Sequence, residues 1–433
     1  MGGTQNILIL GGYGLIGSAI TRLLVREGHS VTGLGRSARK GLAVSPDAKW
    51  ISADLSDLTT PEDWKKPLEG VDVVINASGI LQSGFRDQIS VIQTDAICAL
   101  ISACEAFGTT RFIQISAPGA SESSDTEFYR SKASADDFLK ASGLNWTIFR
   151  PGLVLSPSAY GGTSLSRLLS AFPVVQPIIL PDAPIQTVWV EDVAQAVNAA
   201  IEGDICGDFD LVGADTPSLR DLTLAVRSWL GFSPPVATIV LPSFLGWMTA
   251  GLADIAGLFG WRTALRTTSL KVLTSGVTGD PNPWRETSGQ TCLSLGETLR
   301  QLPSTAQERI YARVMLAFPV CLLVLSFFWI ASGVIGFISF DDAVAVLDGK
   351  IPEGLSTLSV AGGSVADILV GVGLLIRPFT RKAAIAGALL AGGYALASLI
   401  FTPGLWLDPL GPMMKTLPVI AFMALIASVA EER

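Results

Sequence analysis

Short apolar and β-branched runs alternate with segments of helical periodicity over residues 1–155. This alternation is typical of βαβ units, which form a parallel sheet with helices on both faces. The predicted strands are Ile7–Leu10, Val31–Leu34, Trp50–Ile51, Val71–Ile75, Arg111–Ile115 and Trp146–Phe149. The predicted helices are Leu15–Glu27, Pro61–Leu68, Ile89–Phe107 and Lys132–Ala141. The first 155 residues are therefore predicted to form an α/β, Rossmann-like domain with a doubly wound parallel sheet.

The periodic pattern weakens between residues 156 and 305, where Pro and Gly become frequent. One further strand is predicted at Gln186–Val190, followed by a helix from Val193. We interpret this region as a small substrate lobe and linker. Within it, apolar residues recur at helical spacing: Leu245, Met248, Leu252, Ile255 and Phe259. Such a face suits a helix that rests on a bilayer or closes the lobe, and an ordinary core helix is the alternative.

Four apolar stretches follow, at about 311–338, 355–376, 383–401 and 414–430. A helix needs about 20 apolar residues to cross a hydrocarbon core of ~30 Å, so each stretch is predicted to span a membrane. Residues 306–433 are thus predicted to be an all-α domain, a bundle of four transmembrane helices. Residues spaced four apart, Ser332 with Gly336 and Ala388 with Gly392, are expected to allow close helix packing.

The loops between these stretches differ in charge. Basic residues precede the first stretch and separate the second from the third: Arg309, Arg313, Arg377, Arg381 and Lys382. The other two connections contain Asp341, Asp342, Asp348, Glu353 and Asp408, with Lys350 as their one basic residue. Because positively charged loops remain in the cytoplasm, both termini and the nucleotide domain are predicted to be cytoplasmic, in a multi-pass protein of the cell (inner) membrane. The polar start before Ile7 also lacks the pattern of a secretory signal.

Composition agrees with this division. Of the 433 residues, 49% are hydrophobic and 16% are charged, which is too apolar for a wholly soluble protein. A net charge of -8 argues against nucleic-acid binding, because phosphate neutralisation needs a surplus of Lys and Arg. The five cysteines include no CxxC pair, and the one histidine, His29, lies at a helix-to-strand turn. No metal site is therefore expected.

The clearest chemical signal is Gly11-Gly12-Tyr13-Gly14-Leu15-Ile16-Gly17, between the first predicted strand and helix. Gly11, Gly14 and Gly17 form a GxxGxxG pattern, whose glycines permit a tight turn and close approach of a pyrophosphate. The N-terminus of the following helix supplies N–H groups and a positive dipole end. The segment is predicted to bind a dinucleotide, and a glycine-rich loop without a ligand is the alternative.

The ends of the second and third strands bear on the choice of nucleotide. NAD-selective sites have an acidic residue after the second strand, whereas this chain has Arg36 and Ser37. A guanidinium there would pair with a 2′-phosphate, which favours NADP(H) over NAD(H), and a solvated surface arginine is the alternative. Asp54 could accept from the adenine amino group or act as an ordinary turn or N-cap residue.

Five further features accompany the glycine segment: Asn76-Ala77-Ser78-Gly79, Ser116, Tyr129-Arg130-Ser131-Lys132, Arg150-Pro151-Gly152 and Val190-Glu191-Asp192-Val193-Ala194. Together with the glycine segment they resemble the atypical and extended short-chain dehydrogenases. These include the NmrA-like proteins and a complex I accessory subunit that retains a nicotinamide nucleotide. The resemblance covers about residues 5–215. It implies a set of cofactor-binding residues: Gly11, Tyr13, Gly14, Leu15, Ile16, Gly17, Arg36, Ser37, Asp54, Asn76, Ala77, Ser78 and Lys132.

The resemblance also implies a catalytic set, Ser116, Tyr129 and Lys132. In that family a Tyr lies four residues before the Lys, one helical turn away, and transfers a proton. Here Phe128 occupies that position and Tyr129 lies three residues before Lys132, still on the same helix face. Ser116 is expected to polarise a carbonyl and Lys132 to bind the ribose. The departure leaves two hypotheses open, a redox enzyme and a nucleotide-dependent sensor or assembly subunit.

Phe328–Gly333, Asp367 and Trp406–Gly411 with Lys415 are the features by which the last four apolar stretches resemble the DoxX-like membrane modules. Asp367 lies near the middle of its stretch, where a carboxylate must face a partner or a polar cavity. It is either a site for a lipid or quinone head group or a polar clasp between helices. The sequence thus predicts a membrane-anchored NAD(P)H-binding oxidoreductase whose substrate is a lipophilic carbonyl or a quinone. A transporter is a third hypothesis, with Asp367 its one support.

Overall fold

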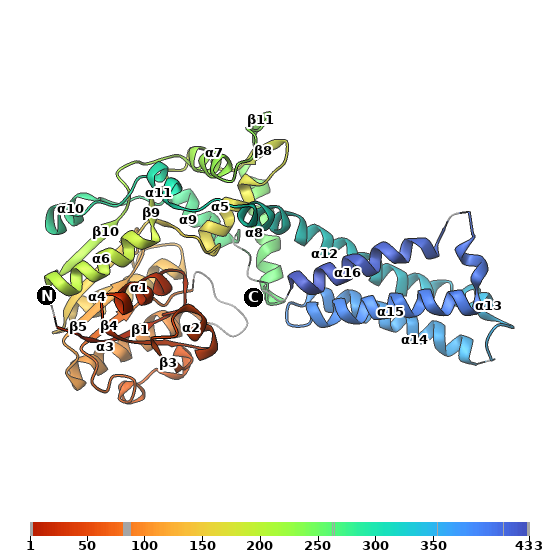
Figure 1. Ribbon diagram of the computed structural model, residues 1–433, viewed down its shortest axis with the longest axis horizontal. Coiled ribbons are helices and arrows are strands. Elements are labelled where there is room, and N and C mark those ends of the chain that lie inside the picture. The colour runs from red at the N-terminus through yellow and green to blue at the C-terminus, as the bar shows by residue number, and fades with distance from the viewer. Residues whose placement is uncertain are drawn as a thin grey trace. The chain divides into compact units, whose positions relative to one another are not determined.

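The computed structural model describes residues 3–80, 88–261, 263, 265–352, 354–409 and 411–430. The chain divides into two compact units (Figure 1). The first comprises residues 1–254 and 263–312, and the second comprises residues 255–262 and 313–433. Two helices, α8 (Ser243–Leu258) and α12 (Ala306–Ile338), contain the borders between the units. Glu353 and Leu410, which belong to the predicted acidic connections and the Trp406–Gly411 motif, lie outside the described residues.

The first unit is built on a parallel sheet. In the described part of the chain it has seven strands in the order β10-β6-β5-β4-β1-β2-β3 (Figure 1). These are β1 (Asn6–Leu10), β2 (Ser30–Gly35), β3 (Lys49–Ser52), β4 (Val73–Asn76), β5 (Arg111–Ile115), β6 (Asn145–Pro151) and β10 (Gly207–Leu211). The order reverses between β1 and β4, and such a switch point opens a crevice at the carboxyl ends of the strands. The site described below lies at these ends.

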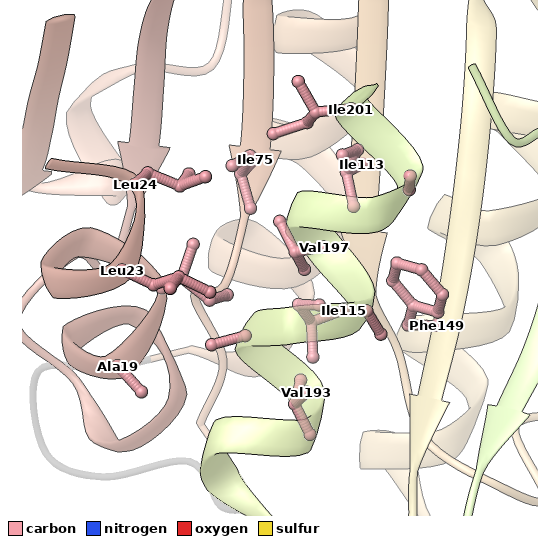
Figure 2. Packing of buried hydrophobic residues seen from close by; sticks show 14 of the residues in the cluster. Ala19, Leu23, Leu24, Ile75, Ile113, Ile115, Phe149, Val193, Val197 and Ile201 are labelled. Atoms are coloured by element: carbon pink, nitrogen blue, oxygen red, sulfur yellow. The ribbon is translucent and has the colours of Figure 1, made fainter. Parts of the chain in front are cut away.

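Helices cover both faces of the sheet. On one side, α1 (Leu15–Arg26) and α6 (Val190–Gly203) pack side by side, and Figure 2 shows Leu23 and Val197 of these helices in one cluster with Ile75 and Ile113 of the sheet. On the other side lie α3 (Ala96–Phe107) and α4 (Glu127–Ala141). Alternate residues of β1 point to opposite faces of the sheet. Ile7 and Ile9 belong to the core under α1 and α6, and Leu8 and Leu10 belong to the core under α3 and α4. This alternation explains why the strand is apolar throughout.

The predicted α/β class and doubly wound sheet are confirmed, and local bounds differ. Helix α4 begins at Glu127, five residues before the predicted start, because Thr126 caps it by accepting from the Tyr129 amide at 3.3 Å. The predicted helix at 61–68 is shortened to a 3-10 turn, η2 (Pro61–Trp64), and the one at 89–107 begins with a π-helical turn, η3 (Val91–Asp95). Strand β10 was not predicted, since its Gly-Asp-Phe-Asp-Leu sequence has two charged positions.

The rest of the first unit forms the lobe. Two pairs of short parallel strands, β7 (Leu153–Leu155) with β9 (Thr187–Trp189) and β8 (Val175–Ile178) with β11 (Ala237–Val240), accompany the helices. The helices are α5 (Gly161–Ser170), α7 (Leu219–Trp229), α9 (Thr267–Ser275), α10 (Asn282–Ser288) and α11 (Leu295–Gln301). The predicted strand at Gln186–Val190 corresponds to β9, with Val190 already in α6.

The second unit is helical. It contains most of α12, then α13 (Phe340–Leu347), α14 (Leu355–Leu375), α15 (Thr380–Phe401) and α16 (Thr416–Val429). In the described chain, three helices are long and apolar enough to cross a membrane, namely α12, α14 and α15. The fourth predicted stretch forms a shorter apolar helical run, Met413–Val429, made of the 3-10 turn η5 (Met413–Lys415) and α16, so a fourth span stays a prediction.

The helices of the second unit pack through small residues around Trp329, Leu374 and Met423. A Cβ on Gly336 would lie 2.3 Å from Ser364 Oγ, so the close packing expected at Gly336 is present. The same expectation at Gly392 is wrong, because nothing lies within 4 Å of a Cβ placed there. Large apolar side chains such as Phe327 and Leu389 point outward and are exposed. An apolar outer face of this kind suits contact with lipid.

Candidate functional site

The glycine turn follows β1 directly. Gly11 adopts φ +68°, and a Cβ there would lie 3.0 Å from the Ala77 carbonyl oxygen and the Ser78 Cα. At Gly17, in the first turn of α1, a Cβ would lie 2.2 Å from the Gly11 carbonyl oxygen. Glycine is therefore required at both positions, by conformation at Gly11 and by space at Gly17. The turn brings the start of α1 against the carboxyl ends of β1 and β4.

Helix α1 begins at Leu15, with Gly14 as its N-cap and no side chain hydrogen-bonded at the cap. The Gly14 amide donates to the Gly11 carbonyl at 2.7 Å, which fixes the turn. Leu15 and Ile16 are partly exposed and Gly17 is buried. The amides of the first turn are thus of the kind that a pyrophosphate binds.

Tyr13 covers the end of β2. A Cβ on Gly35 would lie 2.5 Å from Tyr13 Cε1, and the Tyr13 ring lies 6.1 Å from the ring of Trp50. Arg36 is the next residue and is exposed, while Ser37 caps α2 (Ala38–Val44) by accepting from the Lys40 amide at 3.4 Å. The hydroxyl of Ser37 therefore has a structural partner, and Arg36 is the charged group at this edge.

Asp54 caps the 3-10 turn η1 (Leu55–Asp57). Its Oδ1 accepts from the Ser56 amide at 3.2 Å and from the Ser56 hydroxyl at 3.0 Å. The structure therefore shows the N-cap role that the sequence left open beside a contact to adenine. A contact through the other carboxylate oxygen stays a prediction.

Asn76, Ala77 and Ser78 form the loop after β4. The side chain of Asn76 is 1% exposed, donates to Gln114 Oε1 at 2.9 Å and accepts from the Ser78 amide at 3.0 Å and the Ser78 hydroxyl at 2.5 Å. It is thereby committed to holding the loop in an Asx turn. The residues of this loop that face the glycine turn are Ala77 and Ser78, through their backbone.

Lys132 joins the ends of two strands. Its Nζ donates to the Ile115 carbonyl at the end of β5, at 2.9 Å, and to the Ser78 carbonyl after β4, at 3.2 Å. Burial lowers the pKa of Lys132 to about 8, opposed by the charge of Asp136. The ammonium has three N–H donors and two are used by these carbonyls, so one can serve a ligand above the sheet.

Ser116 follows β5 and pairs with a residue that the sequence analysis missed. The Ser116 hydroxyl donates to Asp136 Oδ2 at 2.5 Å, and the Asp136 side chain is 3% exposed. Its other oxygen, Oδ1, has no hydrogen-bond partner in the described structure. Burial raises the pKa of Asp136, while Ser116 and Lys132 lower it. The signal for this residue was its place four after Lys132, one turn along the same helix.

Tyr129 lies on the same helix and is buried, with its ring 5.4 Å from that of Phe128. Burial raises the pKa of Tyr129, so the phenol stays protonated near neutral pH. A Cβ on Gly119, in the loop that follows Ser116, would lie 3.9 Å from the Tyr129 ring. The structure thus brings Ser116 and Lys132 to the carboxyl ends of β4 and β5, and places Tyr129 beside the loop that follows Ser116.

A pocket of about 230 Å³ opens beside Phe128. It is lined by Ile89, Glu127, Phe128, Asp254, Arg266, Thr267 and Thr268. Across it, Asp254 of α8 accepts from Arg266 Nε at 2.7 Å and from the Thr267 hydroxyl at 2.5 Å. Phe128, which interrupts the expected Tyr-to-Lys spacing, is therefore a wall of a pocket and not an element of the core.

Comparison with known proteins agrees with this geometry. Residues 11–171 match a family described as NAD(P)H-binding, which covers the glycine turn and Lys132. Residues 326–424 match the DoxX-like family, which covers α14 and α15. The chain joins an NAD(P)H-binding domain to a DoxX-like domain. The recognition made from the motifs is confirmed at this level.

The chain is also similar to curated proteins. A photosystem II assembly factor, Ycf39 of Cyanophora paradoxa, is 35% identical over 34% of this chain and 44% of its own length. The ceramide reductase of Caulobacter vibrioides is 24% identical over 57% of this chain and 76% of its own. The chain therefore spans less than half of the assembly factor and about three quarters of the reductase.

Among solved structures, the Bordetella bronchiseptica enzyme WbmH in complex with NAD+ superposes with a TM-score of 0.53 at 17% identity. The superposition covers 69% of this chain and 97% of WbmH. At this identity the likeness establishes the fold, a Rossmann-type domain with its lobe.

Proposed function

We propose that this protein is an NAD(P)H-dependent oxidoreductase of the membrane, whose substrate is a lipophilic carbonyl compound or a quinone. The observation that supports it most is the place of Lys132, buried between the ends of β4 and β5 beside Ser116 and the glycine turn. A lysine there is suited to bind the hydroxyls of a nicotinamide ribose. When bound, the nucleotide would supply the hydride.

The chain's own residues provide a proton donor and a polarising group. Tyr129 is protonated near neutral pH, since burial raises the pKa of its phenol, and its hydroxyl is proposed to donate a hydrogen bond to a carbonyl oxygen. The Ser116 hydroxyl donates to Asp136, and Asp136 in its protonated form would release that hydroxyl to polarise the same oxygen. Both roles are proposals drawn from position and charge.

We further propose that NADP(H) is the preferred nucleotide, because the exposed Arg36 at the end of β2 is suited to pair with a 2′-phosphate. Asp54 would add a contact to adenine through its second carboxylate oxygen. The rest of the proposed nucleotide site is formed by backbone groups and by the shape of the turn and loops. Its residues are Gly11, Tyr13, Gly14, Leu15, Ile16, Gly17, Ser37, Asn76, Ala77 and Ser78.

The lipophilic nature of the substrate is inferred from two features. The nucleotide domain is joined to three helices long and apolar enough to cross a membrane. The pocket beside Phe128 is walled by Asp254 of α8, a helix whose outer side chains are apolar and exposed. The similarity to a ceramide reductase supports the same class of substrate.

We propose that the three helices span the cell membrane with the nucleotide domain in the cytoplasm. Arg377, Arg381 and Lys382 support this orientation, since they lie between α14 and α15. Asp367 accepts from the Ser332 hydroxyl at 2.7 Å and from the Tyr394 hydroxyl at 2.9 Å, so it links α12, α14 and α15. These bonds favour the polar clasp over a head-group site. An Asp367→Asn variant with normal turnover but lower bundle stability is expected on this basis.

The test is consumption of NADPH by the full chain in lipid nanodiscs, with short-chain quinones and aliphatic aldehydes as substrates. The wild type is expected to turn over at least one class, and Lys132→Met is expected to lose both nucleotide affinity and turnover. Ser121→Ala, an exposed serine in the loop after Ser116, is the matched control. Tight NADPH binding without turnover of any of these substrates would contradict the proposal that the protein is an oxidoreductase.

A non-enzymatic sensor or assembly subunit is the second candidate. Phe128 at the family's tyrosine position favours it, as does the similarity to a photosystem II assembly factor. For this candidate, nucleotide binding stabilises the fold and no substrate is reduced. Thermal unfolding with and without NADPH, measured beside the turnover assay, separates the two.

A further inference from the structure

An apolar surface covers one side of the lobe in the first unit. We call it the α8 surface and define it by Val236 and Val240 of the β11 segment and by Phe244, Trp247, Met248 and Leu252 of α8. All six side chains are exposed, with Val236 at 84% and Leu252 at 65%. Large apolar side chains gathered in one segment and exposed to this degree mark a binding surface.

The spacing on α8 explains why these side chains face outward together. Phe244, Met248 and Leu252 are four residues apart and share one side of the helix. Gly246 and Ala250 lie on the opposite side and are buried, and a Cβ on Gly246 would lie 3.0 Å from Ile179 Cδ1. The helix is thus fixed on the lobe by its small residues, and its large residues remain outside.

The segment that forms this surface is uncharged. Between Arg227 and Asp254, residues 228–253 include no Asp, Glu, Lys, Arg or His. A surface that faces water in a soluble protein normally has charged residues of both signs. An interfacial helix usually has basic residues opposite its apolar side, but here that side is buried on the lobe and has no need of them.

Residues 255–258 of α8, and the residues directly after it, belong to the second unit. The Phe259 carbonyl, just after α8, accepts from the Arg377 amide at 2.9 Å. Trp261 Nε1 donates to the Leu375 carbonyl at 2.7 Å, and the Arg377 guanidinium lies 5.4 Å above the Trp261 ring. Leu375 ends α14 and Arg377 precedes α15, so α8 terminates at the ends of two membrane-spanning helices. Trp and Arg at such an end are typical of the interface between lipid and water.

We propose that the α8 surface rests on the lipid bilayer, with its apolar side chains at the boundary between head groups and acyl chains. A side of this kind enters a membrane to a depth of about 5–10 Å. The proposal depends on the membrane-spanning arrangement proposed above and not on the reaction.

The test places a nitroxide at Met248→Cys in the full chain, with the exposed Cys206 replaced by Ser, in lipid nanodiscs. Collision with oxygen, which concentrates in lipid, is compared with collision with a water-soluble nickel complex. Glu286→Cys on α10, exposed and polar, is the water-facing control, and Leu389→Cys on α15 is the lipid-facing control. The spin at Met248 is expected to follow Leu389, with oxygen the more frequent collision partner by several-fold.

Two results would overturn the proposal. One is a spin at Met248 that meets nickel as often as the spin at Glu286 does. The other is a short spin-to-spin distance between two molecules at Met248, which would make a second copy of the chain the occupant. If Leu389 also preferred nickel, the spanning arrangement itself would fail, so the two failures are distinguishable.

Discussion

The Ser116 hydroxyl donates a hydrogen bond of 2.5 Å to Asp136 Oδ2, which joins the residue after β5 to the third turn of α4. Both side chains are buried, and Lys132 lies one turn before Asp136. The proposed catalytic centre therefore includes an acid that the resemblance did not supply and that holds the serine.

Ser116→Ala removes the proposed polarising hydroxyl. Turnover is expected to fall by about 10²–10³-fold, the usual loss for one oxyanion donor, with NADPH affinity unchanged. Steady-state kinetics and an NADPH titration measure the two effects separately. Ser121→Ala should leave both unchanged, and a Ser116→Ala variant as active as the wild type would remove Ser116 from the mechanism.

Lys132 predicts a dependence of nucleotide affinity on pH. With a pKa of about 8, the amine is charged below that pH and neutral above it, so NADPH affinity should decline as the pH rises through about 8. Lys132→Arg keeps its charge and should abolish this step. In the nucleotide-free protein, the pKa of Lys132 is about 8 when folded and has its ordinary value of 10.5 when unfolded. Between pH 8 and 10.5 the unfolded chain binds a proton that the folded chain lacks, so the free energy of unfolding should increase with pH over this range. An affinity that stays flat through pH 8 in the wild type would count against a ribose contact.

Gly17→Ala tests the turn. The added Cβ would lie 2.2 Å from the Gly11 carbonyl oxygen, which forces α1 away from the strand ends. A stability loss of about 1–3 kcal/mol is expected from such overpacking, together with weaker NADPH binding. Gly296→Ala on α11 is the control, since nothing lies within 4 Å of its Cβ and its stability should stay the same or rise slightly. Chemical denaturation with and without nucleotide measures both proteins.

Arg36→Glu tests the choice between NADPH and NADH. Loss of the guanidinium and a new negative charge should lower NADPH affinity by about tenfold or more, the range of a charge-assisted bond to a phosphate, and affect NADH little. Parallel titrations with the two nucleotides measure the ratio. Equal losses for both would mean that Arg36 acts on the fold and not on a 2′-phosphate.

The nucleotide half of this architecture follows from local rules. A strand, a GxxGxxG turn and a helix are specified by neighbouring residues, so β1, Gly11 and α1 were predicted almost to their bounds. The lobe was not, because its short strands and helices depend on contacts between distant segments, as in the pairing of β8 with β11. Asp136 shows the same limit at the site, since nothing in the sequence brings a helix carboxylate to Ser116 except the fold itself.

The membrane half was predicted from hydropathy, loop charge and a resemblance to DoxX-like modules, none of which specifies how its helices pack. Apolar composition marks a segment suited to lipid, but it does not fix the residue at which the regular helix begins. In the stretch at 414–430, the helical run begins with the 3-10 turn at Met413 and continues as α16 to Val429. The position of Asp367 was likewise visible, while its partners Ser332 and Tyr394 required the packing of three helices.

A single-turnover experiment in nanodiscs tests the central claim most directly. The full chain is loaded with one equivalent of NADPH and mixed with a lipophilic quinone or aldehyde already dissolved in the bilayer. The account predicts that the nicotinamide absorbance decays in step with formation of the reduced lipid, and that Lys132→Met and Ser116→Ala slow this decay while Ser121→Ala does not. Bound NADPH that persists unchanged with every such lipid, in a wild-type protein that the nucleotide stabilises, would contradict it.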